Sequence, residues 1–383
     1  MKVFSSRQYL PPGAYPAPIL YPLWRDLHRS QLYGWASPYH EYLKKSLQGK
    51  LPFEFSELAE ADIAVLPFDW QQVRGDSWHD RPNREAAALA LAFAQTVAAA
   101  EKPLAVFFGS DCSDEPVDLP PYLLQNATIF RQSSYRSRPH LAHDPVLPFF
   151  CEDFVQDYAT QDYAQGQLCL RPKQTRPVVG FCGFARPLNL KRRLQAIVYR
   201  GYMHARQRQV IGSPYAGEAL RIQALQSLQD SEGVETRFII RDRSVFFSAS
   251  TYQDKQRVRA EYVDNLFQSD YVLCCRGSGN YSNRLYEVLS CGRIPILINT
   301  DCRLPWENQI NWRDYCVWVE EDDLDSIAEQ VADFHQRLSA KAFLDLQYRC
   351  RQLWLEWLSP QGYFSKFHYF FHSSYSQELF AHV

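Results

Sequence analysis

The sequence lacks several patterns that would assign a function directly. None of its ten cysteines has a second cysteine at CxxC spacing, which argues against a zinc ribbon or a thioredoxin-like site. Basic and acidic residues nearly balance, 41 against 43, and the net charge of −2 gives no electrostatic footprint for nucleic acid or an anionic membrane. The basic run at 191–193 is interpreted as a solvated helix face. A nucleic-acid partner is therefore not expected.

Long apolar runs are also absent. The longest weakly polar stretch, residues 86–100, includes Gln95 and Thr96. A helix of that length spans about 22 Å, less than the roughly 30 Å of a hydrocarbon core, so we expect a buried helix and no transmembrane segment. Without a secretory leader, the chain is expected in the reducing cytoplasm, with cysteines such as Cys274 packing as small hydrophobes.

The sequence does contain enough apolar material for two domains. A chain of 383 residues exceeds one ordinary core, so two domains of about 150–200 residues are expected. The aromatic share of 15% suits large buried surfaces and also clefts in which rings stack on sugars. Core packing is the simpler explanation of the two.

From residue 60 onward, short apolar runs alternate with helical stretches. Strands separated by helices indicate βαβ units and a parallel sheet, and the run at the N-terminus is expected to be an edge strand. Strands are expected at 2–4, 63–66, 104–108, 127–130, 178–181, 238–240, 271–275 and 294–298, and helices at 39–47, 84–101, 188–206, 255–267, 281–290 and within 324–358.

The polar, proline-containing stretch 170–177 is the best candidate linker. It divides the chain into an N-terminal domain, 1–170, and a C-terminal domain, 171–350, with a segment 351–383 that is expected to return to the first. Both domains are expected to be α/β and to form a cleft between them. Ligands of open parallel sheets bind beyond the carboxyl ends of the strands. The loops of interest are 109–115, 181–187, 241–245 and 275–282.

Residues 271–289 are the most informative segment, because a strand, a glycine-rich turn and a helix follow one another. Glycines let the backbone approach a ligand closely, and a helix N-terminus presents unpaired N–H groups suited to phosphate. At 100° per residue, Asn280, Arg284 and Glu287 share one helix face. A pair such as Arg284 and Glu287 is often only a surface salt bridge. After such a turn, however, the arginine can neutralise a diphosphate and the carboxylate can accept two ribose hydroxyls.

A longer pattern surrounds this helix. Its parts are 276–282, Arg284, Glu287, 292–296, 304–312 and, upstream, 60–67. In this order the pattern resembles the exostosin family of glycosyltransferases, although Cys275 stands where that family commonly has proline. The resemblance implies a glycosyltransferase-B fold, in which two Rossmann-like domains face each other and the C-terminal one holds the donor nucleotide. It also implies an inverting mechanism and a UDP-sugar donor.

Eight residues are candidates for donor binding. They are Arg276, Ser278, Asn280, Ser282, Arg284, Glu287, Gly183 and Arg186. The arginines of the helix segment, Ser282 and backbone amides near Asn280 are expected to stabilise charge on the leaving diphosphate, while Glu287 holds the ribose. Gly183 and Arg186 follow the first strand of the second domain, where turns often meet donor phosphates in this architecture. A plain strand-to-helix turn is the alternative.

Asp111 is the candidate general base, because it follows the strand 104–108 and the expected cleft lies at strand ends. An Asx-turn or an N-cap is its alternative role. Rivals for the base are Asp69, Asp114 and the His143–Asp144 pair.

The acidic string 320–325 contains a DxD-like pattern, which could suggest a metal-dependent transferase. It opens a predicted helix, where acidic side chains complement the dipole, and we interpret it as a helix start. We therefore expect no metal and no cofactor, with a UDP-sugar as substrate and a glycan or other hydroxyl compound as acceptor. A nucleotide-sugar epimerase and a non-catalytic nucleotide- or sugar-binding protein remain alternatives.

Overall fold

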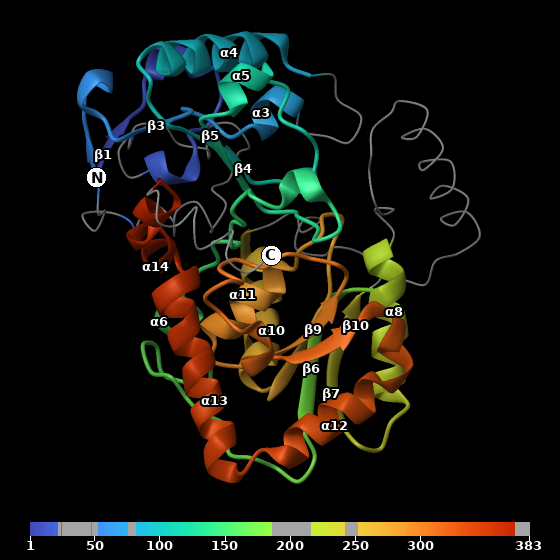
Figure 1. The fold of residues 1–383 in the computed structure, drawn as a ribbon. Helices are drawn as coiled ribbons and strands as arrows, with labels where there is room; N and C mark the ends of the chain where they lie inside the picture. The colour runs from blue at the N-terminus through green and yellow to red at the C-terminus, as the bar shows by residue number, and fades with distance from the viewer. Residues whose placement is uncertain are drawn as a thin grey trace. The chain divides into compact units, whose positions relative to one another are not determined.

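The structure is a computed structural model that describes residues 1–21, Trp24, Leu47, 53–75, 82–185, 216–241 and 252–371. The chain divides into two units: unit 1 comprises Met1–Phe150, Arg303–Gln309 and Glu356–Val383, and unit 2 comprises Cys151–Cys302 and Ile310–Leu355 (Figure 1). Outside the described residues lie Arg186, the expected helix 188–206, most of the loop 241–245 and, apart from Leu47, the expected helix 39–47.

Unit 1 is built on a parallel sheet with the strand order β2-β1-β3-β4-β5. Because β1 is paired on both sides, the expectation of an edge strand at the N-terminus is wrong. The edge is β2, which is too short to produce a recognisable alternation in the sequence. The strands are β1 (Lys2–Phe4), β2 (Glu54–Phe55), β3 (Ile63–Val65), β4 (Leu104–Phe108) and β5 (Ala127–Arg131), and the helices are α3 (Gln71–Arg74), α4 (Arg84–Ala99), α5 (Pro121–Leu124) and α14 (Pro360–Ser365).

Both faces of the unit 1 sheet are covered, which explains why β4 is an unbroken apolar run. All of its side chains are buried, as is typical of a parallel strand between two layers. Val106 and Phe108 belong to a core cluster that includes the buried residues of α4. Phe107 instead stacks on Phe130, with ring centroids 5.0 Å apart, and lies 6.0 Å from the ring of Phe367.

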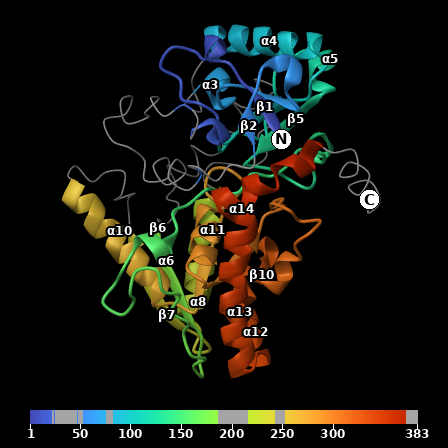
Figure 2. The same ribbon diagram turned by 90° about the vertical axis from the view of Figure 1, so that its left-hand side faces the viewer.

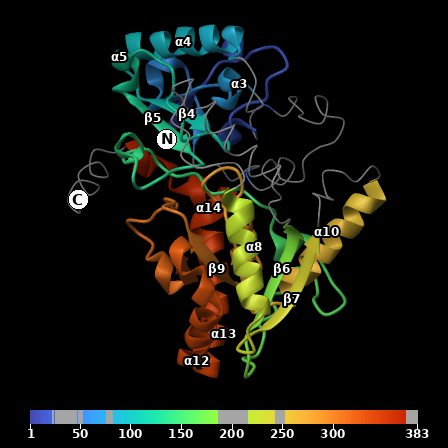
Figure 3. The ribbon, with the colours of Figure 1, turned by 90° about the vertical axis from the view of Figure 1, so that its right-hand side faces the viewer.

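Unit 2 contains a second parallel sheet, with the order β10-β9-β8-β6-β7. The helices α8 and α10 lie on opposite sides of β6 and β7 (Figure 2, Figure 3). The strands are β6 (Val178–Phe184), β7 (Glu235–Arg241), β8 (Tyr271–Cys274), β9 (Ile294–Asn299) and β10 (Val317–Glu320), and the helices are α6 (Phe154–Asp157), α8 (Ala216–Gln229), α10 (Tyr252–Phe267), α11 (Asn283–Ser290), α12 (Ile327–Arg337) and α13 (Ala340–Leu353). The α/β class and the two Rossmann-like units agree with the sequence-based expectation.

Each sheet has the same topology. In unit 2 the chain leaves β6 for β7 on one side and then returns to form β8 on the other side. In unit 1 the strands β1, β2 and β3 repeat this arrangement. Such a reversal of strand order leaves a crevice beyond the carboxyl ends of the two diverging strands, where doubly wound sheets bind their ligands. In unit 2 these are the ends of β6 and β8.

Two local features of unit 2 refine the sequence-based expectations. Helix α11 begins at Asn283, two residues later than expected, because residues 277–281 form a separate turn closed by the Gly277 N–H, which donates to the Tyr281 carbonyl at 3.3 Å. Asn280 therefore precedes the helix and does not share a helical face with Arg284 and Glu287. The acidic string does open a helix, since the 3₁₀ helix Glu321–Ser326 leads directly into α12.

All ten cysteines are free, and all but Cys169 are buried. Cys182, Cys274 and Cys275 therefore pack as small hydrophobes, as expected. None of the described helices is long and apolar enough to cross a membrane.

Candidate functional site

The guanidinium of Arg284 lies at the carboxyl ends of β6 and β8. Its Nη2 donates to the Cys182 carbonyl of β6 at 2.8 Å, and its Nη1 donates to the Leu273 carbonyl of β8 at 3.3 Å. The same group stands 4.4 Å from the ring centroid of Phe181. Helix α11 thus places a fixed cation at the crevice where the strand order reverses.

Gly183 makes room for this cation. The residue lies within β6 rather than in the expected turn, because β6 continues to Phe184. A Cβ atom at Gly183 would lie 2.8 Å from the Arg284 Nη2. A side chain at position 183 would therefore displace the Arg284 guanidinium. The expected contact of Gly183 with donor phosphate stays a prediction.

A second arginine, Arg221, enters the same crevice from α8. Its Nη1 donates to the Phe184 carbonyl at 2.7 Å and its Nη2 to the Arg276 carbonyl at 3.1 Å. Burial lowers the pKa of the Arg221 guanidinium, and the nearby charge of Arg284 acts in the same direction. The first turn of α8 approaches the 276–277 turn so closely that a Cβ at Gly217 would lie 2.4 Å from the Arg276 carbonyl oxygen.

The Nε–H groups of Arg221 and Arg284 are both buried, and neither has a hydrogen-bond partner. Neither guanidinium forms an ion pair with a carboxylate in the part of the chain that the structure describes. A buried donor without an acceptor costs free energy. Two such groups at one crevice favour an anionic ligand.

The turn between β8 and α11 supplies further groups. Arg276 is buried, and its Nη2 donates to the Ser278 carbonyl at 3.1 Å. Asn280 is also buried and accepts a hydrogen bond from the Thr300 hydroxyl at 2.7 Å. Ser282 occupies the N-cap of α11, but its side chain does not cap the helix. The Ser282 side chain therefore leaves the N–H groups of Asn283 and Arg284 uncapped, whereas the Leu285 N–H donates to the Ser282 carbonyl at 3.2 Å.

Glu287 belongs to a buried network between α10 and α11. Its carboxylate accepts a hydrogen bond from the Tyr262 hydroxyl and forms an ion pair with Arg259, whose Nη1 lies 3.4 Å from the Glu287 Oε1. Burial raises the pKa of Tyr262 well above its ordinary value, and the charge of Glu287 adds to this, so the hydroxyl stays protonated and donates. Arg259 also pairs with Glu152 and lies over the ring of Phe154 at 4.7 Å. Sequence reasoning missed this network, because its members come from distant segments.

Both oxygens of Glu287 are thus engaged, and the ribose contact stays a prediction. We expect Glu287→Gln to lower the free energy of unfolding by about 1–3 kcal/mol, because it removes a charged acceptor from two buried donors. The loss stays moderate because Arg259 keeps its pair with Glu152. Urea unfolding measures the change, with Glu329→Gln, an exposed residue of α12, as the control. Equal stability of both variants would contradict a stabilising role for Glu287.

Two residues of the family-like pattern are structural. Gly292 follows α11 with φ of +64°, which few other residues adopt, and a Cβ there would lie 2.7 Å from Leu168. The Arg293 guanidinium is fully buried and donates to backbone carbonyls, including Phe267 at 2.9 Å and Cys169 at 3.0 Å. This part of the pattern holds the fold of unit 2 and does not reach the crevice.

In unit 1, buried arginines neutralise most of the acidic residues near the ends of β4 and β5. Arg138 pairs with Asp114 at 2.8 Å, and Arg131 pairs with Asp144 at 2.5 Å. Glu115 pairs with Arg74 at 2.8 Å. These pairs hold the loops beyond the two strands and engage their carboxylates.

Asp111 differs from these neighbours. It is half-buried, and its carboxylate has no hydrogen bond or ion pair among the described residues. The rival Asp69 accepts hydrogen bonds from the backbone N–H groups of Gly109 at 2.8 Å and Gln71 at 2.9 Å. Of the acidic candidates in this region, Asp111 alone has a carboxylate without a hydrogen bond or ion pair in the described structure.

Comparison with known proteins bears directly on the crevice of unit 2. Residues 218–333 match the model of the Exostosin GT47 domain. This region therefore resembles an exostosin glycosyltransferase domain. The matched region extends from α8 to α12 and so includes Arg221, Arg276 and Arg284. These three arginines at the carboxyl ends of β6 and β8 therefore all lie in the matched region.

Several curated proteins are similar to part of the chain. The chain is similar to Exostosin-1 of Drosophila melanogaster, with 30% identity over 96 residues, which are 25% of this chain and 12% of the relative. A probable glucuronosyltransferase of Oryza sativa subsp. japonica is 36% identical over 75 residues, covering 19% and 17%. A probable beta-1,4-xylosyltransferase of Arabidopsis thaliana is 35% identical over 86 residues, covering 21% of each chain. The matched segments span less than a quarter of each of these exostosin relatives.

Proposed function

We propose that the chain is an inverting glycosyltransferase, which transfers a sugar from a UDP-sugar to a hydroxyl group of a glycan. The observation that carries the proposal is the pair of buried, unbonded Nε–H groups of Arg221 and Arg284 at the end of β6 and β8. A diphosphate supplies the acceptor oxygens and the negative charge that these groups lack. The glycosyltransferase names of the exostosin relatives support the reaction class.

In the proposed reaction, the acceptor oxygen attacks the anomeric carbon while the bond between that carbon and the diphosphate oxygen breaks. Negative charge grows on the leaving UDP. Arg221, Arg276, Arg284 and the free N–H groups of α11 stabilise this charge, which is usually the largest catalytic contribution. Asp111 takes the proton of the acceptor hydroxyl. Attack on the face opposite the leaving group inverts the anomeric configuration.

Acceptor-dependent release of UDP tests this function. A panel of UDP-sugars is first screened for stabilisation of the full chain against heat, since a ligand that binds the folded state raises the melting temperature. Stabilising donors are then incubated with and without a mixture of glycan acceptors. UDP formed only with an acceptor supports transfer. Conversion of the donor to another UDP-sugar without an acceptor would indicate an epimerase, and binding without turnover would indicate a non-catalytic protein.

We expect this activity to survive EDTA. In the proposal, arginines and a helix N-terminus neutralise the leaving group, so a divalent cation has no necessary role. The acidic string at the start of the 3₁₀ helix Glu321–Ser326 serves as a helix start. Initial rates of UDP release are measured before and after chelation. Complete loss of activity that manganese or magnesium restores would contradict the expectation.

A further inference from the structure

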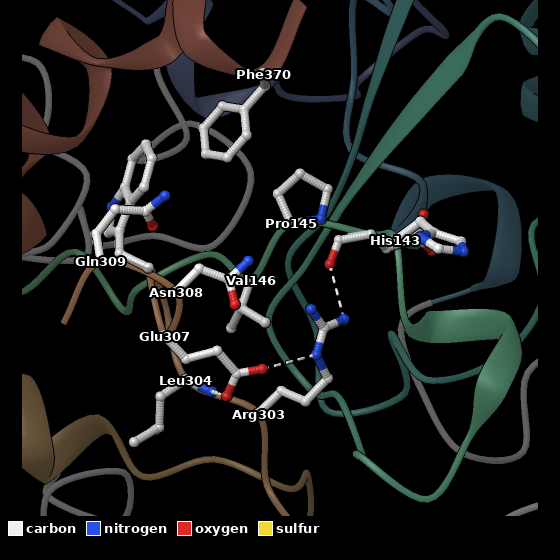
Figure 4. A pocket seen from close by; sticks show the side chains of 11 residues that line it. His143, Pro145, Val146, Arg303, Leu304, Glu307, Asn308, Gln309 and Phe370 are labelled. Atoms are coloured by element: carbon white, nitrogen blue, oxygen red, sulfur yellow. Dashed lines mark hydrogen bonds and ion pairs between the residues drawn. The ribbon is translucent and has the colours of Figure 1, made fainter. Parts of the chain in front are cut away.

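Unit 1 contains a polar pocket that the proposed donor site does not use. It is formed by three segments that are distant in the sequence: the loop after β5, the excursion Arg303–Gln309, and the turn after α14. All of its lining residues belong to unit 1. Asn308, Gln309, Pro145 and Phe370 surround the hollow (Figure 4).

The walls of this pocket are held in place by a half-buried arginine. Arg303 pairs with Glu307 at 3.1 Å and donates to the backbone carbonyls of Asp144, at 3.0 Å, and of Leu141. Arg136 holds the other oxygen of Glu307 at 3.0 Å. The loop after β5 and the excursion Arg303–Gln309 are therefore fixed to each other without any ligand. A preformed site loses little conformational entropy when it binds.

The backbone of the excursion is strained at one residue. Trp306 has φ of +56°, a value that is costly for a bulky side chain, by roughly 1–3 kcal/mol. Its ring stacks on Phe370, with centroids 4.7 Å apart, and meets Trp357 at 5.6 Å. The surrounding aromatic packing holds the strained turn, which presents Asn308 and Gln309 to solvent at the pocket.

The pocket carries little net charge. Arg303 is paired with Glu307, and Asp144 is paired with Arg131 at 2.5 Å. The exposed polar groups on its wall are the imidazole of His143 and the amides of Asn308 and Gln309, and each amide has a donor and an acceptor. A half-buried aromatic ring, Phe370, lies beside them. The arginine on the wall is already paired with a carboxylate, so a nucleotide finds no unpaired guanidinium here.

We propose that this pocket binds a neutral sugar ring of the acceptor glycan. Ring hydroxyls both donate and accept hydrogen bonds and so match the two amides, while the C–H face of a pyranose packs on an aromatic ring. The role as an acceptor site rests on the proposed function, because a glycosyltransferase needs a second substrate. Binding of the neutral sugar itself rests only on the pocket.

Binding of defined oligosaccharides to the full chain tests this inference. The neutral probes are xylotetraose, cellotetraose and chitotetraose, and tetragalacturonate is the charged counterpart. Calorimetry at millimolar concentration should detect at least one neutral probe, and Asn308→Ala or Gln309→Ala should each weaken its binding about fivefold through loss of hydrogen bonds. Gln125→Ala, an exposed glutamine elsewhere in unit 1, is the matched control. UDP affinity should stay unchanged in all three variants.

The outcomes separate this inference from the proposed function. If UDP binds but the two pocket variants bind neutral sugar as well as the control does, the pocket assignment is wrong and the donor site stands. If UDP does not bind while the pocket variants lose neutral sugar, the proposed function fails and the pocket stands. Binding of tetragalacturonate alone, or of no neutral probe, would overturn the inference.

Discussion

Replacing Arg284 or Arg221 by alanine should weaken UDP binding about ten- to a hundredfold. Each guanidinium offers a buried Nε–H without an acceptor, and a hydrogen bond between charged partners contributes about 1.5–3 kcal/mol. The expected loss is in affinity for the diphosphate. Calorimetry with UDP measures it on variants whose melting temperatures show that they remain folded. Arg257→Ala removes an arginine that is 72% exposed in α10 and serves as the control.

A third variant tests the same site without removing a charge. Gly183→Ala adds a methyl group that would lie 2.8 Å from the Arg284 Nη2, so the guanidinium must move. We expect a loss of UDP affinity in the same direction as that of Arg284→Ala, with the charge retained. If UDP binds the Arg284→Ala and Arg221→Ala variants as tightly as the parent chain, the two arginines are braces for the carbonyls of Cys182 and Phe184 and not donor ligands.

Asp111→Asn should lower the rate of sugar transfer about 10²- to 10⁴-fold while leaving UDP affinity unchanged. The substitution keeps the size and polarity of the side chain but removes the basic carboxylate, and general-base catalysis contributes a factor of this order. Asp111 carries no ion pair in the described structure that the change would break. Single-turnover rates with a saturating donor, together with calorimetry, separate the two effects.

Asp118→Asn is the matched control for this experiment, because Asp118 is an exposed aspartate of the same loop region. A turnover near that of the parent chain in Asp111→Asn would reject Asp111 as the base. The search would then move to His143, since Asp69, Asp114 and Asp144 are each engaged with backbone N–H groups or a buried arginine. A parallel fall in UDP affinity would instead indicate a structural role for Asp111.

The sequence predicted the larger strands and helices well where a single local pattern was sufficient. The strand β4 was placed at Leu104–Phe108, because a parallel strand that is covered on both faces is a continuous apolar run. Helix α4 was equally clear from its small, regularly spaced apolar residues. The strands β2 and β10 and the helix α8 were missed. They are short or weakly amphipathic, and their partners in the sheet or layer identify them better than their own residues do.

The residues of the candidate site were likewise predictable only where they lie close together in the sequence. The turn and helix that carry Arg276 and Arg284 are continuous in sequence, so the glycines and the helix start were readable along the chain. The role of Arg221 could not be predicted from the sequence, because Arg221 lies 55 residues from Arg276, whose carbonyl it binds. Gly183 was noticed as a turn glycine, yet its position opposite Arg284 follows only from the pairing of β6 with β8.

By itself, the sequence determined the α/β class, the position of the glycine-rich turn and the resemblance of one region to the exostosin domain, because these depend on local spacing. Only the tertiary structure decided which charged groups are held in hydrogen bonds or ion pairs and which are not. Glu287 is held by Tyr262 and Arg259, whereas Asp111 stays unpaired. Burial and ion pairing depend on side chains that the fold brings together from distant segments, and no pattern along the chain records those distances.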